Sequence, residues 1–165
     1  MPDLVSQGEG VALVDGPRAA GPYVEELDVT AVAIVMGASA NRVWTPAHVD
    51  PDAATAAGIA DMFLDTSTQL GLLSGVAERA AGTDARPGRL ALRMRQPVLR
   101  GHRLRLEATV DPAGPERDTA GVGWISVAVR ALVDGVVHST LDARVAVDTA
   151  DGTDPWSLGP DRWHP

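Results

Sequence analysis

The sequence contains no cysteine and no lysine, and it is short of basic charge. The absence of cysteine excludes disulfide bonds, thiolate nucleophiles, iron–sulfur clusters and zinc–thiolate sites, so any chemistry must use histidine, carboxylate or hydroxyl groups. The 22 acidic residues outnumber the 14 basic ones, which gives a net charge of -8. This balance argues against a nucleic-acid partner, because neutralising phosphates requires clustered cations.

Long hydrophobic runs are also missing. No segment approaches the roughly 20 apolar residues needed to span a bilayer, and residues 1–10 lack the basic and apolar regions of a signal peptide. We therefore expect no membrane partner and a cytoplasmic protein. The apolar material that is present, 45% of 165 residues, is enough for a sizeable core, and this length favours one domain.

The chain divides into an arm, a domain and a tail. Residues 1–22 are rich in Gly and Pro, with one short apolar run at 11–14, and we interpret them as an arm with one strand. Residues 23–148 carry the periodic patterns of a folded domain. Residues 149–165 are a polar, proline-containing tail without a period. Its two large aromatic residues, Trp156 and Trp163, predict that the tail docks on a neighbouring subunit.

The first part of the domain has the signals of short helices. Thr30 has an N-capping side chain and precedes apolar residues at helical spacing, so we expect a helix directly after it. Residues 41–49 contain a proline and are expected to form a loop. Asp50 and Pro51 match the N-cap and first position of a second short helix, which Gly58 ends.

The hydrophobic period then changes along the chain. Apolar residues recur every three or four positions after residue 61, which predicts one long, mostly buried helix within residues 61–82. After Gly88 the period is two, as in half-buried strands, and Asp134-Gly135 has the sequence of a tight hairpin turn, while 111–121 is expected as a long loop. These patterns predict an α+β fold, in which an antiparallel sheet wraps around one long helix.

Among the four histidines, His48 is the strongest candidate for chemistry, because it lies in a loop rather than in a periodic segment. A lone histidine more often packs or caps. We expect His102 and His138 at surface or edge positions of the sheet. Asp50 and Asp52 near His48 do not predict a metal site, since Asp50 starts a helix and no second histidine has ligand spacing. We expect no metal and no cofactor.

The surroundings of His48 resemble a family signature. Residues 42–54 read RVWTPAHVDPDAA, similar to the segment of MaoC-like hydratases and dehydratases in which an Asp and then Pro-x-His precede an acidic, Ala-rich helix. Residues 58–82 resemble the small MaoC-like subunits of heteromeric enoyl-CoA hydratases of actinobacterial steroid side-chain breakdown. The likeness covers residues 30–147. It implies the hot-dog fold, a curved antiparallel sheet around a long central helix, which agrees with the architecture expected from the periodicity.

The resemblance also implies a catalytic arrangement. In the family, an Asp five residues before the His forms an acid–base pair with it, but that position is Val43 here, and valine transfers no proton. The resemblance therefore leaves His48 as the acid or base. Asp65, at the expected start of the long helix, is a candidate replacement; the alternative is that it only caps the helix. The family uses the amides at this helix start, here those of Thr66 and Ser67, to polarise the thioester carbonyl.

Three functions follow from the resemblance. The first is a hydratase or dehydratase acting on an acyl-thioester of coenzyme A or an acyl carrier protein, with Trp44, Thr45 and Pro46 also beside the substrate. The second is a catalytically silent hot-dog subunit of a heteromeric hydratase, which Val43 favours. The third is a hot-dog acyl-thioesterase in which Asp65 activates water. We expect a homodimer or a hetero-oligomer with another hot-dog subunit.

Arginines are concentrated at the start of the expected sheet. We interpret them as a solvated face, with the phosphates of coenzyme A or an acidic carrier protein as the alternative partner. They are Arg86, Arg89, Arg93, Arg95, Arg100, Arg103 and Arg105.

Overall fold

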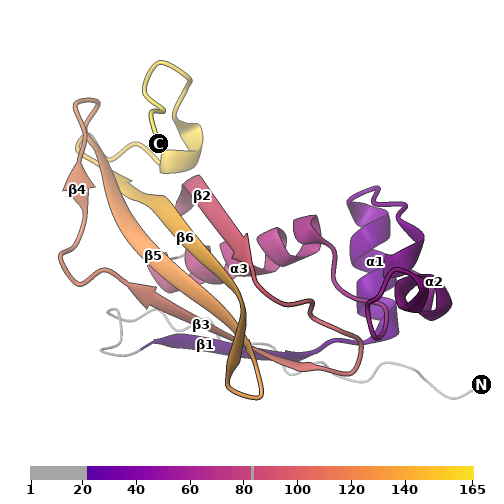
Figure 1. Cartoon of the computed structure of the whole chain (residues 1–165). Coiled ribbons are helices and arrows are strands. Elements are labelled where there is room, and N and C mark those ends of the chain that lie inside the picture. The colour runs from indigo at the N-terminus through magenta and orange to yellow at the C-terminus, as the bar shows by residue number, and fades with distance from the viewer. Residues whose placement is uncertain (1–21, 83) are drawn as a thin grey trace, which may run out of the picture.

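The structure, a computed structural model, describes residues 22–82 and 84–165. The strand expected at 11–14 lies outside them. Within them, one antiparallel sheet has the strand order β1-β3-β5-β6-β2, and the short β4 pairs with β5. Figure 1 shows the long α3 against the sheet, with α1 and α2 near one end of α3. The strands are β1 (Tyr23–Asp28), β2 (Arg86–Met94), β3 (Arg103–Val110), β4 (Glu116–Arg117), β5 (Val122–Val133) and β6 (Val136–Thr149). The helices are α1 (Ala31–Ala40), η1 (Pro46–His48), α2 (Pro51–Ala56), α3 (Thr66–Ala81) and η2 (Pro155–Ser157).

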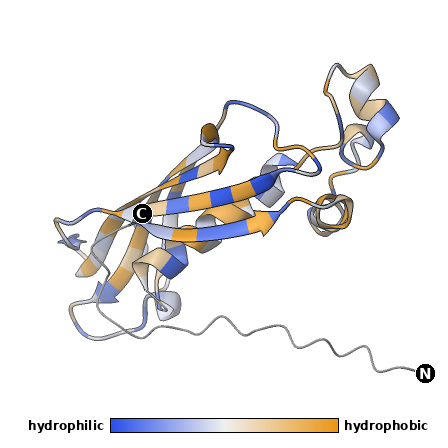
Figure 2. Cartoon of the chain, turned by 90° about the horizontal axis from the view of Figure 1, so that it is seen from below, coloured by the Kyte–Doolittle hydropathy of each residue, from blue (hydrophilic) through white to orange (hydrophobic). Residues whose placement is uncertain are grey.

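The expected half-buried strands are present, and their alternation builds the core. In β3, Leu104 and Leu106 are buried, while Arg103 and Arg105 on the opposite face form ion pairs with Glu26 of β1. Figure 2 shows the resulting alternation of hydrophobic and hydrophilic bands along the strands. The hairpin turn between β5 and β6 has positive φ at both central residues, as its Asp-Gly sequence predicts.

Helix α3 is the long helix expected within residues 61–82, and it packs its buried residues into the main core between itself and the sheet. It begins later than the apolar pattern indicates. Met62 and Leu64 instead form backbone hydrogen bonds to Arg100 and Val98, so this apolar segment is extended rather than helical. No helix in the described ranges is long and apolar enough to cross a membrane.

Helix α1 starts where expected, since the hydroxyl of Thr30 accepts a hydrogen bond from Ala33 N. Its far end is anchored to the first turn of α3. A side chain at Gly37 would overlap Thr68, and Asn41 Nδ2 donates to Thr68 Oγ1 at 3.0 Å. The loop that carries η1 therefore leaves α1 at a fixed place beside the start of α3.

The tail folds back on the chain's own sheet through Trp163, which was expected on a neighbouring subunit; for the exposed Trp156, docking on a neighbour stays a prediction. Trp163 packs on Trp124 with ring centroids 4.9 Å apart, and the Arg86 guanidinium lies 3.7 Å from the Trp163 centroid. Leu158 joins Trp124 in a second, small cluster of buried residues. Trp156 stays exposed, although its indole N–H donates to Ala85 O.

Two strands were not expected. β1 lies in a segment that we assigned to the domain without predicting a strand, and its charged residues pair across to arginines of β3. β4 occupies the middle of the segment expected as a long loop and pairs with Trp124 and Gly123 of β5.

Candidate functional site

His48 ends the short helix η1, which lies between α1 and α2. Pro46 starts this helix after the extended Thr45, and His48 N bonds to Thr45 O at 3.1 Å. The imidazole is only 9% exposed and packs on the Phe63 ring, with centroids 4.3 Å apart. Its Nδ1 lies 2.9 Å from the Phe63 carbonyl oxygen. Because a carbonyl only accepts, Nδ1 carries the proton in this contact, and Nε2 is the basic nitrogen of the neutral ring.

An open hollow of about 290 Å³ lies beside His48. One side comes from the segment around Phe63 and from the first turn of α3, which supplies Thr66 and Gln69. The other side comes from the end of β2 and the residues after it. The lining residues are His48, Phe63, Leu64, Thr66, Gln69, Met94, Arg95, Gln96 and Pro97.

The start of α3 reaches this hollow through Thr66. Among the described residues, no acceptor is bonded to the amides of Thr66 and the exposed Ser67, which are the first free donors of the helix. These amides are suited to polarising a carbonyl oxygen.

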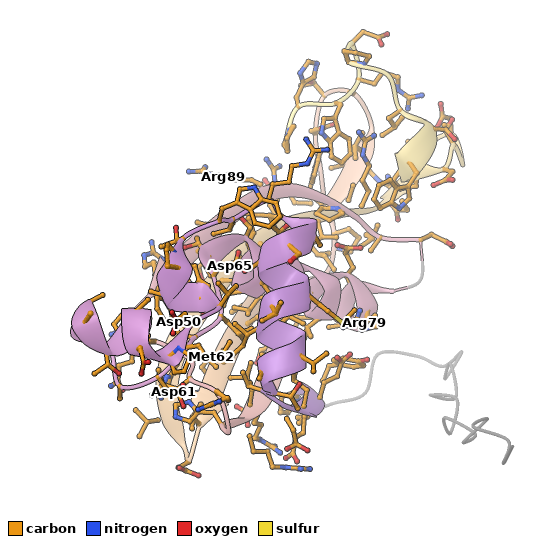
Figure 3. All side chains as sticks on the ribbon, turned by 90° about the vertical axis from the view of Figure 1, so that its right-hand side faces the viewer. Asp50, Asp61, Met62, Asp65, Arg79 and Arg89 are labelled. Atoms are coloured by element: carbon orange, nitrogen blue, oxygen red, sulfur yellow. The ribbon has the colours of Figure 1, made fainter. Side chains whose placement is uncertain are left out.

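Asp65 is turned toward its own helix rather than lining the hollow. Its Oδ1 accepts from Thr68 N at 3.0 Å, and its Oδ2 accepts from the Thr68 hydroxyl. Figure 3 shows Asp65 at the start of α3, close to α1. This is the geometry of a helix N-cap. In the part of the chain that the structure describes, no carboxylate lines the hollow beside His48.

The other residues expected near the substrate are not in the hollow. Trp44 is 73% exposed, and Thr45 and Pro46 are exposed as well. Thr45 and Pro46 instead set up the helix η1 that carries His48. Val43 is half-buried and its amide bonds to Ala38 O at the end of α1. The structure therefore brings His48 and Thr66 together and leaves Trp44, Thr45 and Pro46 outside.

Sequence reasoning missed Gln69 and the wall formed by residues 94–97. Gln69 carries a readable signal, because it is a polar residue on the apolar face of the long helix, one turn before Leu73. Residues 94–97 have no such signal in the sequence, because their approach to His48 depends on how β2 packs beside α3.

A second hollow, of about 460 Å³, adjoins the first and shares Gln96 and Pro97 with it. It is lined by His102 and His138. The burial of His138 corrects its expected surface position, whereas His102 is half-buried just before β3. His138 is 6% exposed, with Nδ1 3.0 Å from Pro97 O, and His102 Nδ1 accepts from Leu99 N at 3.2 Å. Their rings meet edge to face at 5.5 Å. Burial, with a contribution from His138, lowers the pKa of His102 below its usual value.

The arginine strip is largely engaged within the chain. Arg93 pairs with Asp142, and Arg100 pairs with Asp61. Arg103 and Arg105 share Glu26. This pattern is that of a solvated, ion-paired face. Of the strip, Arg95 is the residue that lines the His48 hollow.

Across residues 22–82 and 84–165, no three histidine or carboxylate side chains are grouped so that they would hold a metal ion.

Comparison with known proteins places this geometry in a fold family. No family model and no curated protein sequence matches the chain. A solved structure of the ChsH1–ChsH2 complex from Mycobacterium tuberculosis matches with 24% identity and a TM-score of 0.64, covering 78% of this chain and 98% of that one. The (R)-hydratase from A. caviae involved in PHA biosynthesis matches with 18% identity and a TM-score of 0.62, covering 79% and 98%. A MaoC-like dehydratase from Rhodospirillum rubrum matches with 21% identity and a TM-score of 0.63, covering 79% and 93%.

These similarities agree with the resemblance of residues 42–54 and with the expected architecture. At such identities they establish the fold. The chain therefore has the hot-dog fold, and its structural neighbours are MaoC-like dehydratases and hot-dog hydratases.

Proposed function

We propose that this protein is a hydratase or dehydratase of the MaoC-like kind, acting on an acyl-thioester with His48 as its acid and base. The observation that carries the proposal is the setting of the imidazole. His48 is buried, its Nδ1 is bound by the Phe63 carbonyl, and it lines the same hollow as Thr66 at the start of α3. A histidine able to accept a proton and the first residue of helix α3 thus line one hollow, in a fold shared with hydratases and dehydratases.

The chemistry of hydration suits these groups. The oxygen of a water molecule bonds to the β-carbon of an enoyl thioester, while His48 Nε2 takes the proton from that water. The electron pair of the double bond moves to the thioester oxygen, whose negative charge the amides of Thr66 and Ser67 stabilise. The enolate then re-forms the carbonyl as the α-carbon takes a proton, which the imidazolium supplies. Dehydration is the same sequence in reverse.

A second candidate has its own supporting observation. No carboxylate among the described residues lines the His48 hollow, and the family position for the catalytic Asp is Val43. We therefore propose, as the alternative, a subunit that functions beside another hot-dog subunit, whose own residues do part or all of the chemistry. A neighbour of this chain is itself described as a complex of two named components.

The open edge of the sheet suits such a partner. Among the described strands, β2 pairs with β6 alone, so its other side is free, and its last residue, Met94, lines the hollow. A second hot-dog subunit placed along β2 would lie next to His48. An acyl-thioesterase has no comparable support, since the Asp65 carboxylate is bound by Thr68.

The test is an assay of crotonyl-CoA and a bulkier enoyl-CoA, with this protein alone and together with a candidate hot-dog partner. Water addition is followed by the loss of enoyl absorbance, and thioester cleavage by free thiol. The variant His48→Ala is expected to lose about 10²- to 10⁴-fold in kcat with little change in KM. The control is His164→Ala, which changes an exposed histidine of the tail.

Each result has a separate meaning. Hydration that falls in His48→Ala and persists in the control supports the first proposal. Hydration that requires the partner and is unchanged in His48→Ala supports the alternative, a subunit that functions beside another hot-dog subunit. Thiol release without hydration, or no reaction in any combination, overturns both.

A further inference from the structure

The position of His48 depends on one backbone carbonyl. Its short helix η1 lies in a connection between helices, and the polar contact of the ring is Nδ1 to Phe63 O at 2.9 Å. This contact decides which ring nitrogen carries the proton and where the other nitrogen points. Whatever holds the backbone at Phe63 therefore also sets the orientation of the imidazole.

The next carbonyl along the chain is held by a buried side chain of α3. Gln69 Nε2 donates to Leu64 O at 3.1 Å, and Gln69 is 3% exposed. Its Oε1 accepts from the hydroxyl of Ser139, on β6, at 2.6 Å. Ser139 is fully buried. The reverse orientation of the amide would set its oxygen against the Leu64 carbonyl, so this carbonyl fixes the orientation and the Ser139 hydroxyl donates to the amide oxygen.

The hydrogen-bonded pair of Gln69 and Ser139 is buried at a place where apolar side chains would pack equally well. Gln69 belongs to the buried face of α3 that continues with Leu73, Val76 and Ala77. An apolar side chain would fill such a position without the cost of burying an amide and a hydroxyl. The polar pair therefore has a purpose other than filling the core, and its contacts lead to the segment that binds His48.

We propose that Gln69 and Ser139 are positioning residues for His48. Together with the backbone hydrogen bonds of Met62 and Leu64 to Arg100 and Val98, they hold the backbone at Leu64 and through it the Phe63 carbonyl, so that Nδ1 keeps its proton and Nε2 is the free nitrogen of the ring. The expected effect on the hydration rate rests on the proposed function. The expected effect on the His48 tautomer does not.

The test removes the pair stepwise. Ser139→Ala deletes the hydroxyl, Gln69→Met replaces the amide with an apolar side chain of similar length, and Ser139→Thr keeps a hydroxyl. The control is Ser126→Ala, since Ser126 is exposed on β5 of the same sheet. Every variant is checked by thermal unfolding for a cooperative transition.

The first measurement needs no activity. In protein labelled with ¹⁵N at histidine, long-range proton–nitrogen correlations report the tautomer of His48. Its signal is assigned by its loss in His48→Gln. We expect the Nδ1-protonated tautomer in the unchanged protein, in Ser126→Ala and in Ser139→Thr. In Ser139→Ala and Gln69→Met we expect a mixture of the two tautomers.

The second measurement is enoyl-thioester hydration. Because small displacements of a catalytic group are costly, we expect kcat to fall about tenfold in Ser139→Ala and about 100-fold in Gln69→Met, with KM nearly constant and activity restored in Ser139→Thr. Lower melting temperatures with an unchanged His48 tautomer would overturn the positioning role. The proposed function would be overturned if the unchanged protein hydrates no enoyl thioester, alone or with a partner. If Ser139→Ala and Gln69→Met nevertheless show a mixture of His48 tautomers, the positioning role still holds.

Discussion

At the scale of single residues, the His48 site combines a buried, hydrogen-bonded imidazole with a lining in which the described residues include no carboxylate. The ring is buried and bound at Nδ1, and the helix amides of Thr66 and Ser67 lie at the same hollow or next to it. The carboxylate expected to help, that of Asp65, is bound by Thr68. Two substitutions address this arrangement directly.

The first substitution is Val43→Asp. It puts a carboxylate at the position that the MaoC-like signature fills with Asp, so we expect enoyl-thioester hydration to rise by about tenfold or more. The control is Val43→Asn, because asparagine has the same shape as aspartate but its amide cannot act as an acid or a base. Equal rates for the two variants would show that position 43 does not supply a proton-transfer group.

The second substitution separates capping from catalysis at Asp65. Asparagine also caps helices, so Asp65→Asn should leave both the free energy of unfolding and the hydration rate close to those of the unchanged protein. Asp65→Ala should lose about 1 kcal/mol in urea unfolding, because Thr68 N loses its acceptor. Loss of hydration in a correctly folded Asp65→Asn protein would instead identify a catalytic carboxylate.

At the scale of elements, the C-terminal segment acts as a cover for one end of the sheet. In β5, the alternation of exposed and buried residues holds in the middle of the strand, but its first four residues are all buried. Trp124 points away from the main core and is covered by Trp163 and Leu158 of the tail. Figure 1 shows this segment at the opposite end of the molecule from α1 and α2.

The free energy of unfolding tests whether the packing of Trp163 on Trp124 stabilises the fold. Trp163 is half-buried, so Trp163→Ala should lower the free energy of unfolding by roughly 2 kcal/mol, less than for a fully buried tryptophan. Trp44→Ala is the matched control, because Trp44 is mostly exposed, and it should cost less than about 0.5 kcal/mol. Equal losses in urea unfolding would mean that the tail contributes no packing.

At the scale of the whole molecule, the sheet formed by residues 22–82 and 84–165 ends in two edges, β1 and β2. Unpaired edges favour pairing with another chain. The hollow beside His48 opens near the end of β2, so an added subunit would both cover the edge and enlarge the site.

The assembly is predicted to be a dimer or larger. Sedimentation at micromolar concentration should give a mass of about twice the 17.2 kDa of the chain, or the mass of a mixed complex when another hot-dog subunit is present. A stable species near 17 kDa under both conditions would contradict this prediction.

The pH dependence of stability should carry a contribution from His102. Burial, followed by the nearby His138, lowers the pKa of His102, and Asp134 opposes this effect. Since the folded state favours the neutral ring, this contribution is complete above the unfolded pKa of about 6.5 and is lost as pH falls through the lower folded pKa.

This effect is measured by urea unfolding at several pH values. From about pH 7 to pH 5, the free energy of unfolding should fall less steeply in His102→Gln than in the unchanged protein or in the control His164→Gln. Parallel curves for all three proteins would show that His102 titrates alike in the folded and unfolded chain.

The sequence by itself determined most of the local elements and their order, although not the strands β1 and β4. Thr30 and Asp50 cap their helices as expected, Asp134-Gly135 turns the hairpin, and the change of period after Gly88 marks the sheet. These signals depend on neighbouring residues or on the alternation within one element. The same local patterns, with the signature around His48, were enough for the hot-dog fold.

Only the tertiary structure decided which residues meet. Residues 48, 69, 97 and 139 are far apart in the chain, and no periodicity relates them; they converge because β2, β6 and the start of α3 pack together. For the same reason, His138 was expected on a polar face and is buried beneath Pro97, and Trp163 was expected on a neighbour and lies on Trp124. Side-chain direction follows from the local backbone, but burial depends on what packs above it.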